Sequence, residues 1–168
     1  MSPDARPAAL AAWVTLAACA PSDATVCSTG RMVGTSENED MAPGQTCLAC
    51  HAYVNAGGDG MEAPSFAFAG TVYASAHEPD GCAGGPVPSG AEHAEVEVIS
   101  ATGQHYVAPV TDGGNFMLEA TAIAFPIKAS IRFQGRTRAM IGAQPVGECN
   151  LCHTVTGMGG APGRIMLP

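Results

Sequence analysis

Two short segments of the chain repeat one pattern of two cysteines and a histidine. The first is Cys47-Leu48-Ala49-Cys50-His51, and the second, 102 positions later, is Cys149-Asn150-Leu151-Cys152-His153. Two thiols at this spacing reach the two vinyl groups on one edge of a porphyrin, and the histidine that follows reaches the iron. The pattern therefore predicts two covalently bound haem c groups. Their thioethers would form at Cys47, Cys50, Cys149 and Cys152, and their proximal iron ligands would be His51 and His153.

Two Cys-x-x-Cys pairs also occur in other classes of site. A zinc ribbon uses two such pairs, but they usually lie about 15 to 20 residues apart and need no histidine after each pair. A thioredoxin-like redox pair requires a strand-helix-strand context that neither segment has. A disulfide within each pair would be strained. The repeated histidine favours haem over these three alternatives.

Haem iron normally takes a methionine or a histidine as its sixth ligand. The candidates, in order of preference, are His77, then Met140, and then Met41 and Met166. His77 lies in an irregular stretch that no strand pattern includes, and Met140 shortly precedes the second motif. For each methionine, a packing or surface role is the alternative. His93 and His105, in or beside predicted strands with polar neighbours, are expected to be surface residues.

The N-terminus has the pattern of an export signal. A short apolar stretch leads to Leu16-Ala17-Ala18-Cys19, which resembles the bacterial lipobox. This resemblance implies that residues 1–18 are a signal peptide, that Cys19 is lipidated, and that the protein is anchored to the outer membrane at its periplasmic or cell-surface face. An ordinary secretory signal and a mobile apolar tail are the alternatives. Export would place the other cysteines in an oxidising compartment.

Cys27 and Cys82 remain after the haem and lipid assignments. A disulfide between them would close a loop of about 55 residues and contribute roughly 3 to 4 kcal/mol to stability.

From Ser65 onward, apolar and polar residues alternate with the period of β-strands. The predicted strands contain 66–73, Val96 and Val98, about 104–110, 115–119, 127–133 and 137–141, with Gly- and Pro-rich turns between them. Several short strands at such spacing predict a mainly β chain with a small antiparallel sandwich. The expected parts are a signal peptide (1–18), an irregular segment with the first haem site (19–64), the β-sandwich (65–142) and a segment with the second haem site (143–168).

Composition and charge exclude some functions. The chain has 168 residues with 15 acidic and 7 basic side chains, a formal charge of −8. So acidic a chain would repel nucleic-acid phosphates. Residues 1–125 stand at −12 and residues 126–168 at +4. Lys128, Arg132, Arg136 and Arg138 could form a solvated strand face, pair with haem propionates, or dock an acidic redox partner.

Three strings resemble a known sandwich domain. Gly70-Thr71-Val72-Tyr73, Ala94-Glu95-Val96-Glu97-Val98 and Gly114-Asn115-Phe116 are similar to the G-x-V, A-x-V-x-V and G-x-F strings of the carboxypeptidase regulatory-like domain. This resemblance implies an Ig-like or transthyretin-like sandwich. With Cys-x-x-Cys-His at both ends, residues 41–168 resemble exported bacterial dihaem cytochromes. The helical pair and distal methionine of common small cytochromes c are missing from their usual places, so the axial ligands stay open.

Two functions from different classes are expected. The first is single-electron transfer between exported redox partners by a dihaem lipoprotein with no enzyme activity of its own, since no catalytic cluster is apparent. The second is a haem-stapled β-sandwich that acts as a binding or structural module at the cell envelope. Two reversible redox couples would favour electron transfer. Five-coordinate iron that binds CO or NO would instead suggest a gas sensor or a peroxidase-like site.

Overall fold

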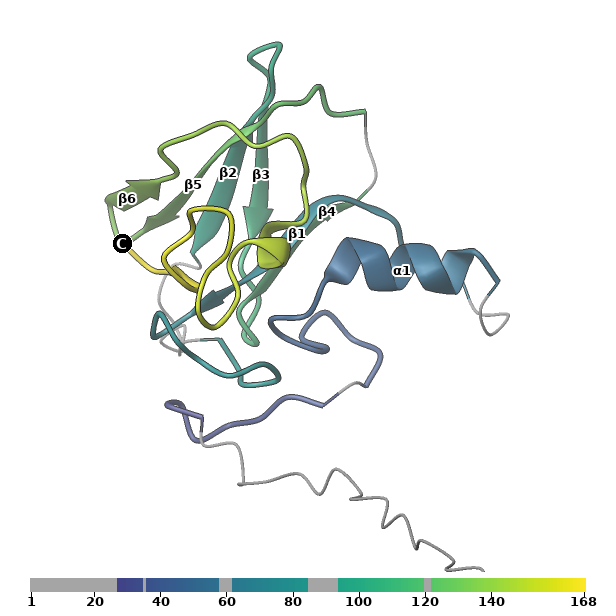
Figure 1. Cartoon of the computed structure of the whole chain (residues 1–168), viewed down its shortest axis with the longest axis vertical. Helices are drawn as coiled ribbons and strands as arrows, with labels where there is room; N and C mark the ends of the chain where they lie inside the picture. The colour runs from purple at the N-terminus through teal and green to yellow at the C-terminus, as the bar shows by residue number, and fades with distance from the viewer. Residues whose placement is uncertain (1–26, 35, 58–61, 85–93, 120–121) are drawn as a thin grey trace, which may run out of the picture.

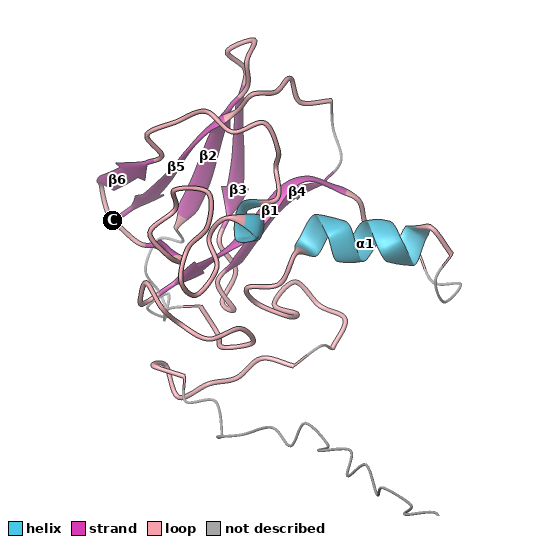
Figure 2. Ribbon diagram, in the orientation of Figure 1, coloured by secondary structure: helices cyan, strands magenta, loops and turns pink. Residues whose placement is uncertain are grey.

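The computed structural model describes residues 27–34, 36–57, 62–84, 94–119 and 122–168 (Figure 1). The expected signal peptide (1–18), the lipidation candidate Cys19 and His93 lie outside these ranges. Within them the chain is mainly β, with two sheets, one helix and one short 3₁₀ turn (Figure 2). The mainly β prediction is therefore confirmed.

The smaller sheet has three strands in the order β4-β1-β7. Its central strand, β1 (Phe66–Tyr73), pairs antiparallel with β4 (Asn115–Glu119) and parallel with β7 (Ile165–Met166). β7 was not predicted, because two residues in a Gly-rich tail carry no periodicity. Its pairing with β1 attaches the C-terminal segment to the sandwich.

The larger sheet has four antiparallel strands in the order β3-β2-β5-β6. They are β3 (His105–Pro109), β2 (Glu95–Ile99), β5 (Lys128–Phe133) and β6 (Arg136–Ala139). Along β2 the predicted alternation is present, since Val96 and Val98 are buried and Glu95 is exposed. β6 lies at one edge of the sheet, and all of its residues are exposed.

The two sheets enclose one hydrophobic core between them. The three-stranded sheet supplies Phe68, Val72 and Phe116, and the four-stranded sheet supplies Val96, Val98, Ala108 and Ile131. β1 is buried continuously from Phe68 to Tyr73, as expected for a strand covered on both sides. Phe68 and Val72 belong to this core, whereas Thr71 and Tyr73 contact the segments that carry the two motifs.

The expectation of irregular structure over residues 19–64 is wrong for Cys47–Asn55, which forms the helix α1. No residue of α1 is buried, so the helix has no apolar stripe of the usual kind. Cys47, Cys50, His51 and Val54 nevertheless recur at i, i+3, i+4 and i+7, which is the spacing of one helix face. The helix was missed because none of its residues is fully buried, so packing against a core imposes no clear helical period on its apolar residues.

Cys27 and Cys82 form the predicted disulfide, with their Cα atoms 5.4 Å apart. The neighbouring carboxylate of Glu78 is also buried, at 2% exposure. It accepts hydrogen bonds from Ser28 N (2.6 Å), Ser28 Oγ (2.6 Å) and Ser75 Oγ (2.9 Å). The disulfide and Glu78 together attach the segment after residue 26 to the loop that follows β1.

Acid is expected to weaken this attachment. Desolvation raises the pKa of Glu78. The hydrogen bonds from Ser28 and Ser75 and the charge of Arg164 lower it by more, so the pKa lies below its usual value. The ionised carboxylate therefore stabilises the fold above the unfolded-state pKa, and this stabilisation is lost as the pH falls through the folded-state pKa.

Glu78→Gln is expected to cost about 1 to 3 kcal/mol at pH 7, because hydrogen bonds to a charged acceptor are replaced by neutral ones. The cost should shrink as the pH falls below 4.5, the unperturbed pKa of the side chain. Urea unfolding at pH 7 and at pH 3 to 4 measures both values. An equal cost at both pH values would mean that the charge of Glu78 contributes nothing.

Candidate functional site

The first Cys-x-x-Cys-His motif lies on the first two turns of α1. Cys47, Cys50 and His51 share one helix face because they are three and four residues apart. His51 is oriented by a hydrogen bond between its Nδ1 and the main-chain oxygen of Pro64 (2.7 Å) and by the Phe66 ring, whose centroid is 4.8 Å from its own. A donor Nδ1 leaves Nε2 of His51 free to bind a metal.

The second motif forms a single helical turn. Its 3₁₀ segment η1 spans Cys149–Leu151, and the N–H of His153 donates to the oxygen of Cys149 (3.0 Å). This turn brings Cys149, Cys152 and His153 to one side. Nδ1 of His153 bonds to the main-chain oxygen of Gly163 (2.9 Å), so its Nε2 is also left free.

Both motifs therefore offer the donor set that covalent haem requires. The four motif cysteines form no disulfide, and each histidine has the Nδ1-to-carbonyl hydrogen bond that fixes the tautomer and the orientation of a metal-binding imidazole. The motif side chains do not converge as zinc ligands would. In the described ranges, three potential ligand atoms meet only at Cys27, Glu78 and Cys82, where both sulfurs belong to the disulfide.

Exposed apolar side chains accompany both motifs. Tyr53 on α1 is 68% exposed, and Leu151 within the second motif is 47% exposed. Met158, which is also exposed, donates its main-chain N–H to the oxygen of Cys152 (2.8 Å). A large planar apolar group attached to the cysteines could cover such surface.

Glu148 joins the two motifs directly. Its Oε2 accepts hydrogen bonds from the N–H of Leu48 (2.7 Å) and of Ala49 (3.4 Å), so the residue before the second motif caps the N-terminus of the helix that carries the first. Figure 1 shows η1 beside the N-terminal end of α1. The two motifs, far apart in sequence, therefore lie next to each other.

Asn150 makes a second link from within the second motif. It is 2% exposed, and its Nδ2 donates to the oxygen of Gln45 (2.8 Å) and to Thr71 Oγ1 (3.2 Å), while its Oδ1 accepts from the N–H of Thr71 (3.0 Å). Gln45 immediately precedes Thr46, which occupies the N-cap position of α1 without making a side-chain capping hydrogen bond. Strand β1 therefore contacts both motifs and supports them in common.

Gly70 on β1 allows this close approach. A Cβ atom at this position would lie 2.8 Å from Cβ of Cys149 and 2.6 Å from Cζ of Phe116. Both distances are shorter than real Cβ contacts, so any side chain at Gly70 would displace the second motif or the core.

The environment of the site raises the pKa of two of its thiols, those of Cys47 and Cys149. Desolvation, with the charge of Glu148 second, raises the pKa of Cys47 to about 11. Desolvation, Glu148 and the neighbouring Cys47 raise the pKa of Cys149 to about 12. Desolvation also raises the pKa of Glu148, against the hydrogen bonds from the N-terminus of α1. Thiolate-dependent chemistry such as disulfide exchange is therefore disfavoured at Cys47 and Cys149.

Of the candidates for a sixth ligand, His77 lies beside the second motif. Its Nδ1 bonds to the oxygen of Val155 (2.7 Å), two residues after His153. Met166 is in β7 next to β1, and Met41 lies in the loop before α1. Met140 extends the four-stranded sheet through a hydrogen bond to Ala129 (2.9 Å), whereas both motifs contact the three-stranded sheet.

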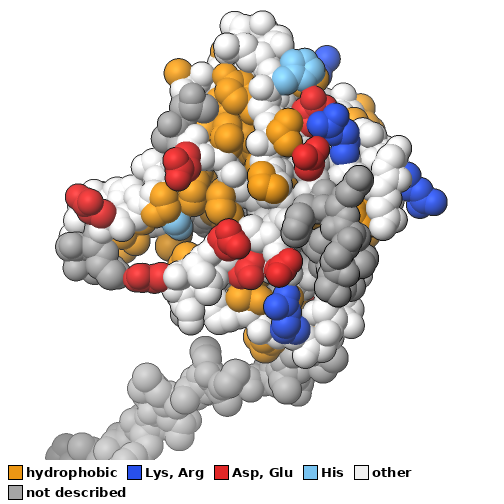
Figure 3. All heavy atoms as spheres, turned by 180° about the vertical axis from the view of Figure 1, so that it is seen from behind, with side chains coloured by type: hydrophobic (Ala, Val, Ile, Leu, Met, Phe, Trp, Pro, Cys, Tyr) orange, Lys and Arg blue, Asp and Glu red, His pale blue; other side chains and the backbone are white. Residues whose placement is uncertain are grey.

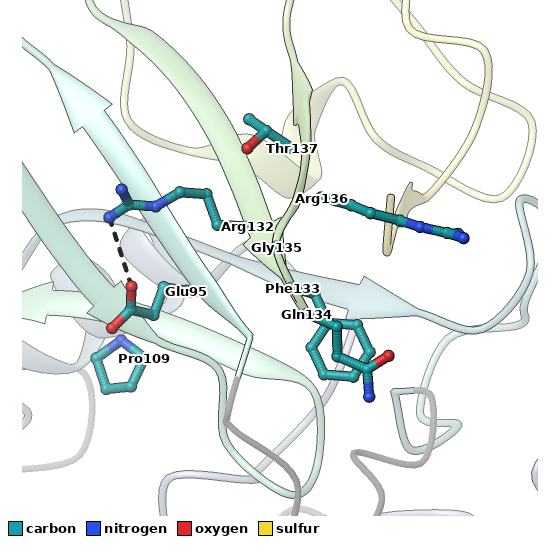
Figure 4. Close-up of a pocket in the computed structure, with 8 residues that line it drawn as sticks. All are labelled: Glu95, Pro109, Arg132, Phe133, Gln134, Gly135, Arg136 and Thr137. Carbon is teal, nitrogen blue, oxygen red and sulfur yellow. Dashed lines mark hydrogen bonds and ion pairs between the residues drawn. The ribbon is translucent and has the colours of Figure 1, made fainter.

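His105 is exposed and bonds to Glu97 (2.8 Å), as expected for a surface histidine. The basic side chains of the β5–β6 hairpin are also exposed. Arg132 pairs with Glu95 (3.4 Å) beside a hollow whose lining includes no motif residue. The Arg136 side chain points in the direction opposite to that of Arg132 (Figure 4). On the face in Figure 3, basic side chains lie mainly toward the upper right and acidic ones mostly lower and to the left.

The sequence reasoning missed Glu148, Asn150 and Arg164 as functional residues. Glu148 and Asn150 flank Cys149, and this position was the only signal in the sequence; their partners lie about 100 residues away. Arg164, in the Gly-rich tail, donates to the oxygen of His153 (3.2 Å).

Over the ranges that the structure describes, no helix combines the length and the apolar character needed to cross a membrane. No protein-family model, no curated protein and no solved structure matches the chain, so a function for the two motifs has to be inferred from their own residues and contacts.

Proposed function

We propose that this chain is an exported dihaem c-type cytochrome lipoprotein that passes single electrons between redox partners. The observation that carries the proposal is that two Cys-x-x-Cys-His motifs lie side by side, linked by hydrogen bonds from Glu148 to Leu48 and from Asn150 to Gln45. A haem c supplies a one-electron iron couple when bound. Two attachment points on one site would let an electron that enters at one motif leave at the other.

Each residue has a defined role in this proposal. The cysteine pairs Cys47/Cys50 and Cys149/Cys152 hold the two porphyrins through thioethers. Nε2 of each motif histidine binds iron, while the main-chain oxygens of Pro64 and Gly163 orient the rings. His77 is the proposed sixth ligand at the second motif because its hydrogen bond to Val155 holds it beside that motif.

The lipid anchor at Cys19 would keep the protein at the outer membrane, and the β5–β6 hairpin would dock an acidic exported redox protein. Arg136 and Arg138 are exposed on an edge strand and make no ion pair among the described residues. Such charges steer association more than they strengthen a complex. The association rate should therefore fall with rising salt.

A second candidate function is a haem-stapled binding module. The fully exposed edge strand β6 favours it, because such an edge can pair with a strand of another protein. Redox measurements distinguish the two candidates. An electron carrier would show two reversible redox couples that exchange electrons with its partner. A binding module would bind its partner with the same affinity whether its haems are reduced or oxidised.

The first test is a pyridine haemochrome assay with intact-mass spectrometry on protein exported through a cytochrome c maturation system. The full chain should carry the mass of two covalent haems. Cys47→Ala/Cys50→Ala and Cys149→Ala/Cys152→Ala should each lose one haem, and the variant with all four changes should lose both. Protein that folds without haem, or that holds zinc instead, would overturn the proposal.

A further inference from the structure

Arg164 is a buried cation in direct contact with the second motif. It is 3% exposed, and its Nη1 donates to the oxygen of His153 (3.2 Å) while its Nε donates to the main-chain oxygen of Glu78 (2.9 Å). Its Nη2 pairs with Asp80, and its Cζ lies 4.8 Å from the centre of the Tyr73 ring. The adjacent Gly163 supplies the oxygen that orients His153.

The groups around Arg164 only partly balance its charge. Its side chain is 1% exposed but that of Asp80 is 52% exposed, so water screens the anion more strongly than the cation. Burial keeps the pKa of Tyr73 far above neutrality, so this ring stays uncharged. The carboxylate of Glu78 accepts its hydrogen bonds from Ser28 and Ser75 and acts on Arg164 only through its charge, while its main-chain oxygen accepts from Arg164 Nε.

The first motif has no such cation. Within the described ranges, no lysine or arginine hydrogen-bonds to α1, and the charged group that contacts it is the carboxyl of Glu148. Lys128, Arg132, Arg136 and Arg138 lie on the four-stranded sheet, away from the strand that supports both motifs. Glu148 lies next to Cys149 as well as to α1, so it is Arg164 that makes the local charge of the two motifs differ.

We infer that Arg164 raises the reduction potential of the haem at the second motif above that of the haem at the first, which makes the second motif the accepting end of the chain. The inference rests on the proposed function. Reduction adds one negative charge to the iron centre, and a nearby buried cation stabilises the reduced form relative to the oxidised form. Electrons would then pass from the first motif to the second.

Two substitutions of opposite sign test this role. Arg164→Met removes the cation, and Asp80→Asn removes the half-exposed anion that offsets it. Spectroelectrochemical titration of the dihaem protein gives both potentials, which the two single-haem cysteine variants assign. At a fixed applied potential, Arg164→Met should lower the ratio of reduced to oxidised second haem about tenfold, which is about 59 mV for one electron. Asp80→Asn should raise this ratio.

Three controls separate this effect from loss of structure. Arg164→Lys keeps the charge, so the reduction potential of the second haem should stay close to that of the unmodified protein. Arg31→Met removes an exposed cation, which bonds to the oxygen of Asp112 (2.7 Å), and should move neither potential. The first haem should shift much less than the second in every variant. If Arg164→Met fails to fold, Asp80→Asn alone still decides the direction.

Shifts of equal size in both haems, a fall of the second potential in Asp80→Asn, or no shift at all would overturn the inference. A second haem that is the lower-potential centre in the unmodified protein would overturn it as well. These outcomes leave two bound haems in place. A chain without covalent haem would instead overturn the proposed function.

Discussion

Removal of the Cys27–Cys82 disulfide is expected to lower the free energy of unfolding by about 3 to 4 kcal/mol. The bond spans 55 residues, so its loss gives the unfolded chain a large gain in conformational freedom. Both cysteines are buried, at 7% and 0% exposure, which makes alanine the suitable replacement. Urea unfolding of the haem-loaded Cys27→Ala/Cys82→Ala variant measures the loss.

The single variant Cys27→Ala is the matched control, because either substitution breaks the bond. It should already show most of the loss, and the second substitution should add little. A loss below about 1 kcal/mol in the double variant would show that the Glu78 contacts hold the segment after residue 26 without the covalent link.

Asn150→Ala is expected to destabilise the protein by about 1 to 3 kcal/mol. The substitution leaves the buried N–H of Thr71 without a partner, whereas water can reach the oxygen of Gln45 because that residue is exposed. The link between α1 and η1 would then depend on Glu148 alone. Equilibrium unfolding in urea gives the free-energy difference from the parent protein.

Asn55→Ala is a closely matched control. The Asn55 side chain also makes three hydrogen bonds, with Ala63 N (2.8 Å), Ala63 O (2.9 Å) and Ser65 Oγ (3.2 Å). It is exposed, so water can replace the lost partners and its loss should cost well under 1 kcal/mol. Equal costs for the two variants would contradict the proposed importance of the buried link between the motifs.

Local patterns in the sequence were sufficient for strands β1 to β6, but not for the two-residue strand β7. Val96 and Val98 alternate with Glu95 and Glu97, and a residue buried on one face of a strand leaves this period of two in the sequence. α1 was missed although Cys47, Cys50, His51 and Val54 share one helix face, because its side chains are not packed into a protein core. Periodicity detects residues that are fully buried in a core, and no residue of this helix is.

The sequence by itself determined the donor residues of the two motifs, since the spacing of two cysteines and a histidine is a local property. It also reduced the disulfide to one pair by elimination. Only the tertiary structure decided that the motifs meet. The carboxyl of Glu148 reaches Leu48, Asn150 reaches Gln45, and Arg164 reaches the main-chain oxygen of Glu78 only after β1 has brought these distant segments together. Contacts across about 100 residues depend on how the sheets pack, and a single sequence carries no periodic signal for them.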